Sequence, residues 1–373
     1  MTEHTAGGAS NVEGKDIRGN VVTLKRTNPE QLSLFQTFLP DDDKYSNTIE
    51  LYDAIPKYYP IKKMHDKRVN DTFLPHLERE FEHKGHTYRL LISPGRVIYK
   101  DGTAREFYPS FREELVEEAL RKIACDCLNG VFLDGQAGVQ FTLYELRKEL
   151  KTRGHDMDIS DLIESLKICN LASLTVRDSS GKALIQSPIF PVLLIASKAD
   201  WMENPKQAHC YVQFHPLVTA SINHISYRQY DYLTYMTYKH RLSRWIHKRL
   251  AHNYVQASMM HPYSISLSTI LRDSGAYQAP RGSNRPREVE TALDELKAKQ
   301  VVMEWKKVEK RGARNKIIDI IYTLYPDFSF VDEVKKANAR SKRTVATVEL
   351  LPLPTPSRYP QAHPPDRQNM ALQ

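Results

Sequence analysis

The sequence has few cysteines and no long apolar run. Its four cysteines, Cys125, Cys127, Cys169 and Cys210, form no CxxC pair and have no histidines at zinc-finger spacing. We therefore expect reduced, buried thiols and no metal site. The apolar run at 188–196 is shorter than the roughly 20 residues that a membrane-spanning helix needs, and the N-terminus lacks the order of a signal peptide. These absences predict a soluble, cytoplasmic protein without a membrane partner.

Recognisable catalytic motifs are also missing. The two stretches nearest to a phosphate-binding loop, GASNVEGKD and SSGKA, have the wrong glycine spacing and no Ser or Thr after the lysine. The sequence has no HEXXH motif and no pair of histidines flanking one apolar residue, which a metal-dependent DNA nickase would use. We predict no enzymatic activity and no cofactor. Because the chain holds 20 tyrosines, a strand-nicking initiator of rolling-circle replication is kept as an alternative.

Positive charge is present in excess and is unevenly distributed. The 373-residue chain has 53 Lys and Arg against 45 Asp and Glu, a net charge of +8. Residues 221–325 carry 18 basic and 9 acidic side chains, whereas residues 111–220 carry 12 and 15. The excess favours a polyanion as partner, and its distribution assigns the contact to the second half of the chain.

Composition divides the chain into four parts. Residues 1–50 are polar and lack periodicity, and residues 327–373 are first basic and then proline-rich, so we expect a disordered arm and a disordered tail. The length between them suits two domains, at 51–220 and 221–326.

One order of elements occurs twice between these ends. The first copy predicts helices at 111–128, 142–151 and 158–169, a short strand at 139–141, and a hairpin that turns at 178–181. The second copy predicts helices at 230–253, 267–273 and 284–299, a strand at 263–265, and a hairpin that turns at Gly312. Helix, strand, helix, helix, hairpin is the winged-helix order. The predicted fold is therefore α+β, with two tandem winged-helix domains.

The third helix of the second copy is the candidate recognition helix. Val289, Leu293 and Leu296 recur at helical spacing and should face the core. Side chains that can pair with base edges then face solvent: Asn284, Arg285, Arg287, Glu288 and Thr291. Acidic residues near the C-terminus of the helix suggest that only its N-terminal half enters the major groove. The alternative is a solvated surface helix.

The hairpin of the second copy is rich in cations. Lys310, Arg311, Arg314 and Lys316 surround Gly312, which suits phosphates or a minor groove beside the recognition helix. Arg281 and Arg285 extend the same basic surface and should position the protein on phosphates. Lysines that serve solubility are the alternative.

The first domain is less suited to DNA. Its third helix presents Asp158, Asp161 and Glu164, so it would bind phosphates poorly. Lys182 in the hairpin is the main basic candidate. We expect a secondary DNA contact or a dimer interface in this domain.

A short apolar motif lies in the polar arm: Gln31, Leu32, Ser33, Leu34 and Phe35. Two leucines and an aromatic beside a glutamine amide make a compact extended ligand for an apolar groove. QLSLF resembles the pentapeptide by which bacterial polymerases bind their sliding clamp. The alternative is a chance cluster that docks on the body of the protein.

The second half resembles a known family. HRLSRWIHKRLAHNY, YSISLSTILRDSGAY, RPREVETALDELKAKQVVMEW and the hairpin are similar to the C-terminal half of RepA-type plasmid replication initiators of Gram-negative bacteria, and the likeness extends more weakly over 51–325. It implies a protein that binds directly repeated sites in double-stranded plasmid-origin DNA and helps melt an AT-rich segment. It also implies recruitment of the host helicase and sliding clamp, self-association between monomer and dimer, and repression of its own gene. A winged-helix transcriptional repressor is the first alternative.

Overall fold

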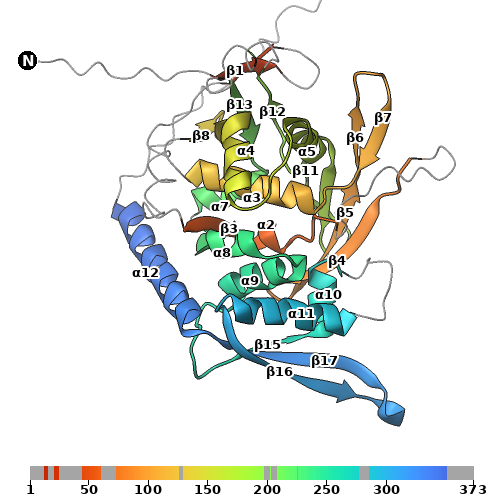
Figure 1. Cartoon of the computed structure of the whole chain (residues 1–373), viewed down its shortest axis with the longest axis vertical. Coiled ribbons are helices and arrows are strands. Elements are labelled where there is room, and N and C mark those ends of the chain that lie inside the picture. Colours follow the sequence, from red (N-terminus) through yellow and green to blue (C-terminus); the bar gives the residue numbers. More distant parts are fainter. Residues whose placement is uncertain are drawn as a thin grey trace, which may run out of the picture.

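The structure is a computed structural model that describes residues 12–15, 21–24, 44–59, 73–125, 129–196, 202, 208–224, 226–276 and 285–350. Its side chains are described within residues 44–339 of these ranges. Helices and small antiparallel sheets alternate along the chain (Figure 1), so the fold class is α+β, as predicted. Within these ranges, none of the helices is long and apolar enough to cross a membrane.

The second domain has the predicted winged-helix order. Its elements are α9 (Arg241–Asn253), β15 (Tyr263–Ser266), α10 (Leu267–Asp273), α11 (Arg285–Ala298), β16 (Val302–Arg311) and β17 (Ile317–Pro326). The three strands form one sheet in the order β15-β17-β16. Val289, Leu293 and Leu296 are fully buried, and they pack in one core with Ile246 and Leu250 of α9. The helical spacing therefore identified the buried face of α11 correctly.

The helix expected at 230–253 is broken into three elements: β14 (Tyr227–Asp231), α8 (Tyr232–Thr237) and α9. Asp231 ends the strand and caps α8, since its carboxylate accepts hydrogen bonds from the backbone N–H and the hydroxyl of Thr234. β14 pairs with β3 (Tyr45–Ile49), which lies far away in the sequence. The prediction of one long helix was therefore wrong. It arose because apolar residues keep helical spacing across both breaks.

The first domain keeps the predicted helix order around different sheets. Its helices are α3 (Phe111–Cys125), α4 (Leu143–Thr152) and α5 (Ile159–Leu171). A capping box, Thr142 with Glu145, begins α4. Asp158 stands at the N-cap of α5 without a side-chain hydrogen bond to it. The hairpin β10 (Ser173–Arg177) and β11 (Ala183–Pro188) follows.

Strand pairing in the first domain departs from that of the second. β9 (Gln136–Thr142), the strand before α4, pairs with β8 (Gly130–Leu133) and β13 (His209–Gln213), and not with the hairpin. β12 (Leu193–Leu194) joins β13. The stretch after the turn at 178–181 therefore divides between two sheets, since β11 pairs with β10 and β12 pairs with β13.

Two further hairpins occupy a region to which the sequence assigned no elements. β4 (Leu77–His83) and β5 (His86–Ser93) extend the sheet of the first domain to the order β11-β10-β5-β4. β6 (Gly95–Ile98) and β7 (Ala104–Phe107) form a separate hairpin that projects from the body in Figure 1. α7 (Pro216–Asn223) packs against β9.

A buried ionic cluster joins the two domains. Asp53 on α2 (Glu50–Ala54) lies 2.9 Å from Arg121 of α3 and 3.4 Å from Lys248 of α9. Lys248 also pairs with Glu118. Burial alone would raise the pKa of Asp53, but Arg121 and Lys248 lower it well below its usual value. Breaking one member would leave a buried charge unpaired, so the cluster fixes the contact between the domains.

Both ends of the folded part lie beyond the expected boundaries. A short hairpin, β1 (Val12–Lys15) with β2 (Val21–Leu24), and the buried strand β3 fall inside the expected arm. α12 (Phe328–Leu350) falls inside the expected tail, because Phe330, Val331 and Val334 complete the core of the second domain. The motif at 31–35 and residues 351–373 lie outside the described residues.

Candidate nucleic-acid interface

The outward face of α11 carries the predicted base-reading side chains. Arg287, Glu288 and Thr291 are exposed, and Arg285 is half-buried at the first position of the helix. Asn284 and Arg281 lie outside the described residues. Arg287 has no acidic partner in the part of the chain that the structure describes, so its guanidinium is available to a guanine or a phosphate.

The hydroxyl of Thr291 is already used. It donates a hydrogen bond to the carbonyl oxygen of Arg287 at 2.8 Å, one turn earlier in the helix. Its oxygen can still accept a hydrogen bond, and its methyl group can contact a thymine methyl.

The acidic residues of α11 hold the helix in place. Asp294 accepts a hydrogen bond from the indole of Trp305 on β16 at 2.9 Å, and Glu290 pairs with Lys307 of the same strand at 2.8 Å. Glu295 accepts from the backbone N–H groups of residues 239 and 240 at 2.6 and 3.1 Å, and so caps the N-terminus of α9. Three acidic side chains therefore tie α11 to the wing and to α9, while Arg287 and Glu288 on the outward face near its N-terminus stay exposed.

The hairpin of β16 and β17, called the wing below, ends in a tight turn with two residues in the left-handed region. Arg314 has φ 58° and ψ 29°, and Asn315 has φ 60°. The backbone N–H of Lys316 donates to the carbonyl of Ala313 at 3.4 Å, so residues 313–316 form a type I′ turn. Asn tolerates this conformation well, whereas an arginine at the first central position is unusual. The strained turn places the guanidinium of Arg314 at the tip.

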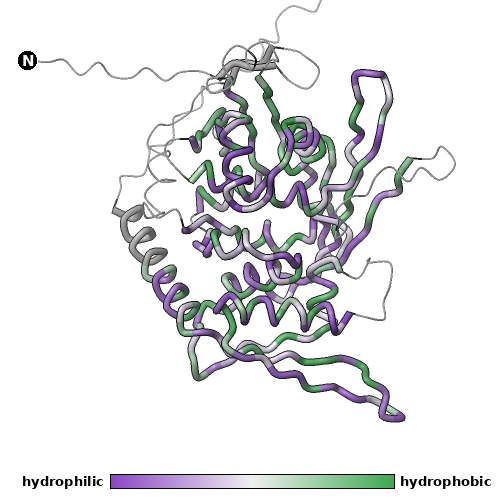
Figure 2. The backbone as a smooth tube through the Cα atoms, in the orientation of Figure 1, coloured by the Kyte–Doolittle hydropathy of each residue, from purple (hydrophilic) through white to green (hydrophobic). Residues whose placement is uncertain are grey.

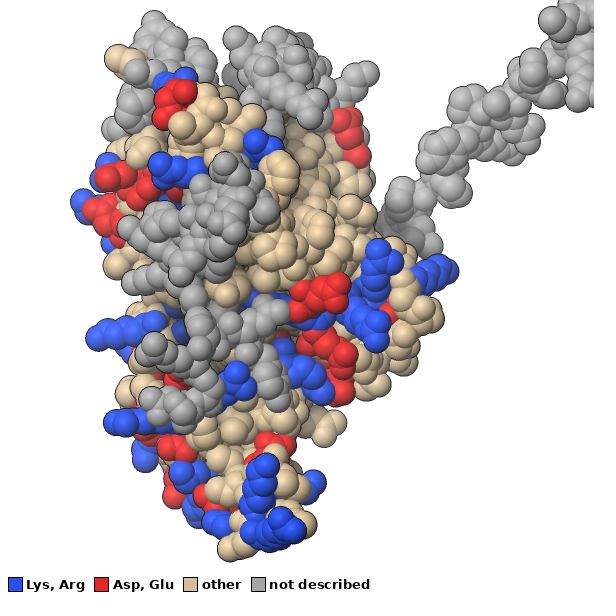
Figure 3. Space-filling view, turned by 90° about the vertical axis from the view of Figure 1, so that its right-hand side faces the viewer, with Lys and Arg blue, Asp and Glu red and all other residues tan. Residues whose placement is uncertain are grey.

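Three of the four predicted wing cations are unpaired. Lys310, Arg314 and Lys316 are exposed and have no ion pair within the described ranges. Arg311 pairs with Glu309 and also donates to the carbonyl of Asn315 at 3.1 Å, so it braces the turn and is less available to DNA than the sequence suggested. Basic side chains gather over the wing at the lower end of Figure 3.

The third helix of the first domain is covered. Val97 and Phe107 of the β6–β7 hairpin pack against Ile168, in a cluster that also includes Leu171 of α5. The approach is close: a Cβ on Gly95 would lie 2.9 Å from the backbone nitrogen of Ala172. The hairpin therefore covers the C-terminal half of α5, whereas Ser160 and Asp161 near its N-terminus are exposed.

The acidic face of α5 is neutralised inside the domain. Glu164 accepts a hydrogen bond from Tyr99 of the hairpin and pairs with Arg112 at 2.7 Å. Arg112 also lies 3.6 Å from Asp161. The hairpin itself exposes Arg96, Lys100 and Arg105, and Lys182 is exposed in the neighbouring turn. The alternating stretch 95–107 around Asp101 and Gly102 was the sequence signal for this hairpin, and it went unassigned.

The tyrosines of residues 227–238 are packing residues. Tyr230, Tyr232, Tyr235 and Tyr238 are at most 3% exposed. Tyr230 donates to Glu118, and Tyr235 donates to Glu114 at 3.2 Å. In this conformation their hydroxyls do not reach solvent, where a DNA strand would approach. No cluster of three or more metal-ligating side chains occurs among the described residues.

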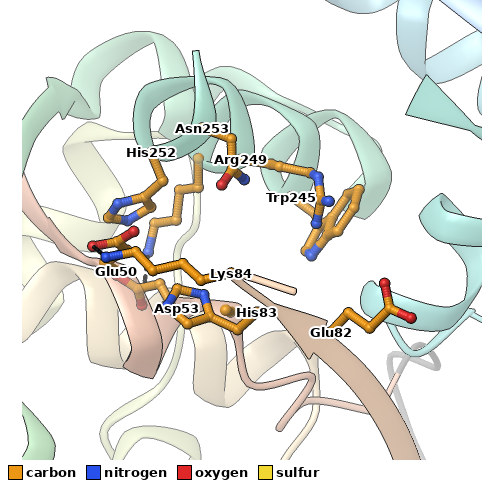
Figure 4. A pocket seen from close by; sticks show the side chains of 11 residues that line it. Glu50, Asp53, Glu82, His83, Lys84, Trp245, Arg249, His252 and Asn253 are labelled. Atoms are coloured by element: carbon orange, nitrogen blue, oxygen red, sulfur yellow. Dashed lines mark hydrogen bonds and ion pairs between the residues drawn. The ribbon is translucent and has the colours of Figure 1, made fainter. Parts of the chain in front are cut away.

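A small polar pocket of about 60 Å³ lies at the contact between the domains. α2, the tip of the β4–β5 hairpin and α9 line it, as Figure 4 shows. Thr48 donates its hydroxyl proton to Asp53 and lies 2.7 Å from Nε2 of His252. His252 must therefore carry its proton on Nε2 and donate it to Thr48. Because the charges around the pocket pair with one another, we assign it no ligand.

No protein-family model matches the chain, and no curated protein matches it. Among solved structures, it is similar to a selenomethionine form of domains 2 and 3 of RctB, with 11% identity and a TM-score of 0.41, over 74% of this chain and 96% of that one. A second structure of these RctB domains has 10% sequence identity to the chain and a TM-score of 0.41, and the match covers 76% of this chain and 99% of that one. The Pi initiator protein in complex with iteron DNA has 10% sequence identity and a TM-score of 0.39, and the match covers 58% of this chain and 91% of that one. Likeness at this level does not assign the chain to a family.

Proposed function

We propose that the chain is a plasmid replication initiator that binds double-stranded DNA in a sequence-specific way through its second domain. One observation supports the DNA-binding step above all others. The N-terminal half of α11 exposes Arg287 without an acidic partner, in the same winged-helix unit whose wing carries three unpaired cations. Free cations on a recognition helix and on its wing are what a groove-reading surface requires.

In this proposal α11 lies in the major groove and the wing lies over the adjacent backbone. Arg287 pairs with a guanine, Glu288 accepts from a cytosine, and Thr291 contacts a thymine methyl. Asn284 and Arg285 extend this contact at the start of the helix. Phosphates are bound by Arg281, Lys310, Arg311, Arg314 and Lys316.

The initiator role rests on the sequence resemblance. This resemblance implies that the chain binds directly repeated origin sites and opens the origin. It also implies that the chain recruits the host helicase and switches between monomer and dimer. Residues 31–35 would bind the sliding clamp. A transcriptional repressor needs the same groove-reading surface, so the pattern of bound sites has to separate the two functions.

The test is a footprint of the purified chain on DNA flanking its own gene, at two salt concentrations and against random competitor DNA. Protection of several direct repeats at helical spacing is expected for the initiator. Protection of one inverted repeat over a promoter would assign the chain to the repressors. Binding that is salt-sensitive and leaves no footprint would contradict sequence-specific recognition.

Clamp binding is tested separately. Replacing Leu34 and Phe35 with alanine should abolish capture of the host clamp while leaving the footprint unchanged. Capture that is as strong as for the unaltered chain would remove this part of the proposal. The strand-nicking alternative predicts a covalent protein–DNA adduct on supercoiled origin DNA with a divalent metal, and we expect none.

A further inference from the structure

The wing carries exposed apolar side chains that belong to no hydrophobic core of the described residues. Val308 is 63% exposed, Ile318 58% and Ile317 44%, and Ile321 is exposed as well. In Figure 2 hydrophobic colour runs along β17 towards the tip, beside a more hydrophilic β16. β15 pairs only with residues 321–324 of β17, so the distal part of the wing is a two-stranded ribbon without a third strand. Ile317 and Ile318 are adjacent beside the turn, and exposed apolar groups concentrated there indicate that the tip meets a partner.

Ile317 and Ile318 lie at the tip because of an irregularity in the ribbon. Lys310 pairs with Asp319, but Arg311 pairs with Ile317, so Ile318 is the extra residue of a β-bulge. Its side chain lies over Gly312, where a Cβ would be 2.9 Å from Cγ2 of the isoleucine. The bulge and the glycine together hold a second large apolar side chain next to the turn.

The surrounding charge favours one kind of partner. Lys310, Arg314 and Lys316 are exposed around the two isoleucines and have no ion pair within the described residues. An apolar protein surface would have to desolvate these cations without compensating them. In a minor groove, the cations can contact phosphates while an isoleucine inserts between base pairs. The combination suits duplex DNA better than an apolar protein groove.

We propose that the tip of the wing inserts Ile317 and Ile318 into the minor groove, partly unstacks one base step, and so kinks the duplex beside the site read by α11. This inference rests on the proposed duplex binding and adds a deformation to it. Pyrimidine–purine steps unstack most easily, so the wing should prefer a TA or CA step at that position.

The experiment compares two double variants of the full chain on the footprinted duplex. The tip variant is Ile317→Ser with Ile318→Ser. The matched control is Val308→Ser with Ile321→Ser, a cross-strand pair further from the tip that is also exposed. Energy transfer between labelled DNA ends measures the bend, and permanganate reactivity of thymines measures unstacking. Circular dichroism and thermal unfolding verify that each variant folds, with Ile317→Ala and Ile318→Ala as a second tip variant.

We expect the unaltered chain and the control to bend the duplex and to make one thymine beside the protected site reactive. The tip variants should do neither and should bind about tenfold more weakly, a difference close to 1.4 kcal/mol. A mismatch at that step, which is already unstacked, should restore most of their affinity.

Three results would overturn the inference while leaving the proposed function intact. They are a straight duplex in the complex of the unaltered chain, a tip variant that bends DNA fully, and an equal loss of bending in the control. If instead the unaltered chain protects no duplex, the proposed function itself fails.

Discussion

At the residue scale, the proposed recognition of bases depends most on Arg287. It is exposed on the outward face of α11, near the N-terminus of the helix, and has no acidic partner among the described residues. Arg287→Ala should cost about 1 to 3 kcal/mol of binding free energy on the footprinted site and much less on random DNA. Gel-shift titrations on both duplexes measure the difference. Equal losses would make Arg287 a phosphate contact.

Arg314 offers a second test at this scale, because strain and charge act in opposite directions there. Its left-handed backbone costs about 1 kcal/mol or more for a residue with a Cβ. Arg314→Gly relieves that strain, so the free energy of unfolding should not fall. If Arg314 neutralises one phosphate, the slope of log K against log salt should become shallower by about 0.9.

Arg314→Lys is the matched control for this prediction, since it keeps the charge in the same turn. Its slope should equal that of the unaltered chain. A slope that is unchanged in the glycine variant would show that the tip does not contact DNA.

At the element scale, Glu295 connects two helices. Its carboxylate accepts from Ser243 at 2.6 Å, besides the two backbone N–H groups before α9. The N-cap of α9, His240, supplies no side-chain cap of its own. Glu295→Ala should therefore lower the free energy of unfolding by about 1 to 2 kcal/mol, measured by urea denaturation. Lys297→Ala, an exposed change on the same helix, should stay within about 0.5 kcal/mol.

Local signals predicted α10 and α11 of the second domain almost to the residue, although they missed the breaks before α9. α10 begins and ends where expected, and α11 differs from 284–299 by one residue at each end. The signals were caps, glycines and helical spacing, all of which act within a few residues. The same helical spacing predicted that Arg287 and Glu288 are exposed, and these two residues belong to the candidate site on α11.

Features built from distant residues could not be predicted in this way. The break before α9 depends on Glu295, more than 50 residues away, and β14 depends on β3. The cover over α5 comes from a hairpin that precedes it by more than 50 residues. The pairing of Arg311 with Glu309, which reduces its availability to DNA, depends on how two side chains lie on the ribbon. Spacing along a sequence carries no information on such contacts.

At the scale of the whole molecule, buried neutral histidines make stability depend on pH. Burial lowers the pKa of His215 to about 3, of His247 to about 4 and of His252 to about 3, against 6.5 for an ordinary histidine. Below pH 6.5 the unfolded chain binds protons that the folded chain does not, so stability falls as the pH falls. Each histidine contributes about 1.4 kcal/mol per pH unit in that range.

Urea denaturation between pH 7.5 and 5 should therefore show a steepening loss of stability below pH 6.5. His252→Gln, whose amide can still donate to Thr48, should remove about a third of the slope, because one of three comparable groups no longer titrates. The buried carboxyl of Asp53 has a lowered pKa, so its contribution is lost only at lower pH, below the ordinary carboxyl value of 3.8. Stability that is constant from pH 7.5 to 5 would contradict the burial of these rings.

The pairing of β3 with β14 also determines when the molecule can finish folding. Every residue of β3 is buried, yet its partner strand begins at Tyr227, 178 residues after Ile49. At about 5 to 20 residues per second of synthesis, the ribosome needs roughly 10 to 40 seconds to supply that partner. During this interval the nascent chain carries a strand whose backbone N–H and C=O groups have no partner strand, and such an edge can pair with other nascent chains. The yield of folded protein should therefore depend on how fast residues 50–231 are translated and on whether a chaperone shields β3 until β14 emerges.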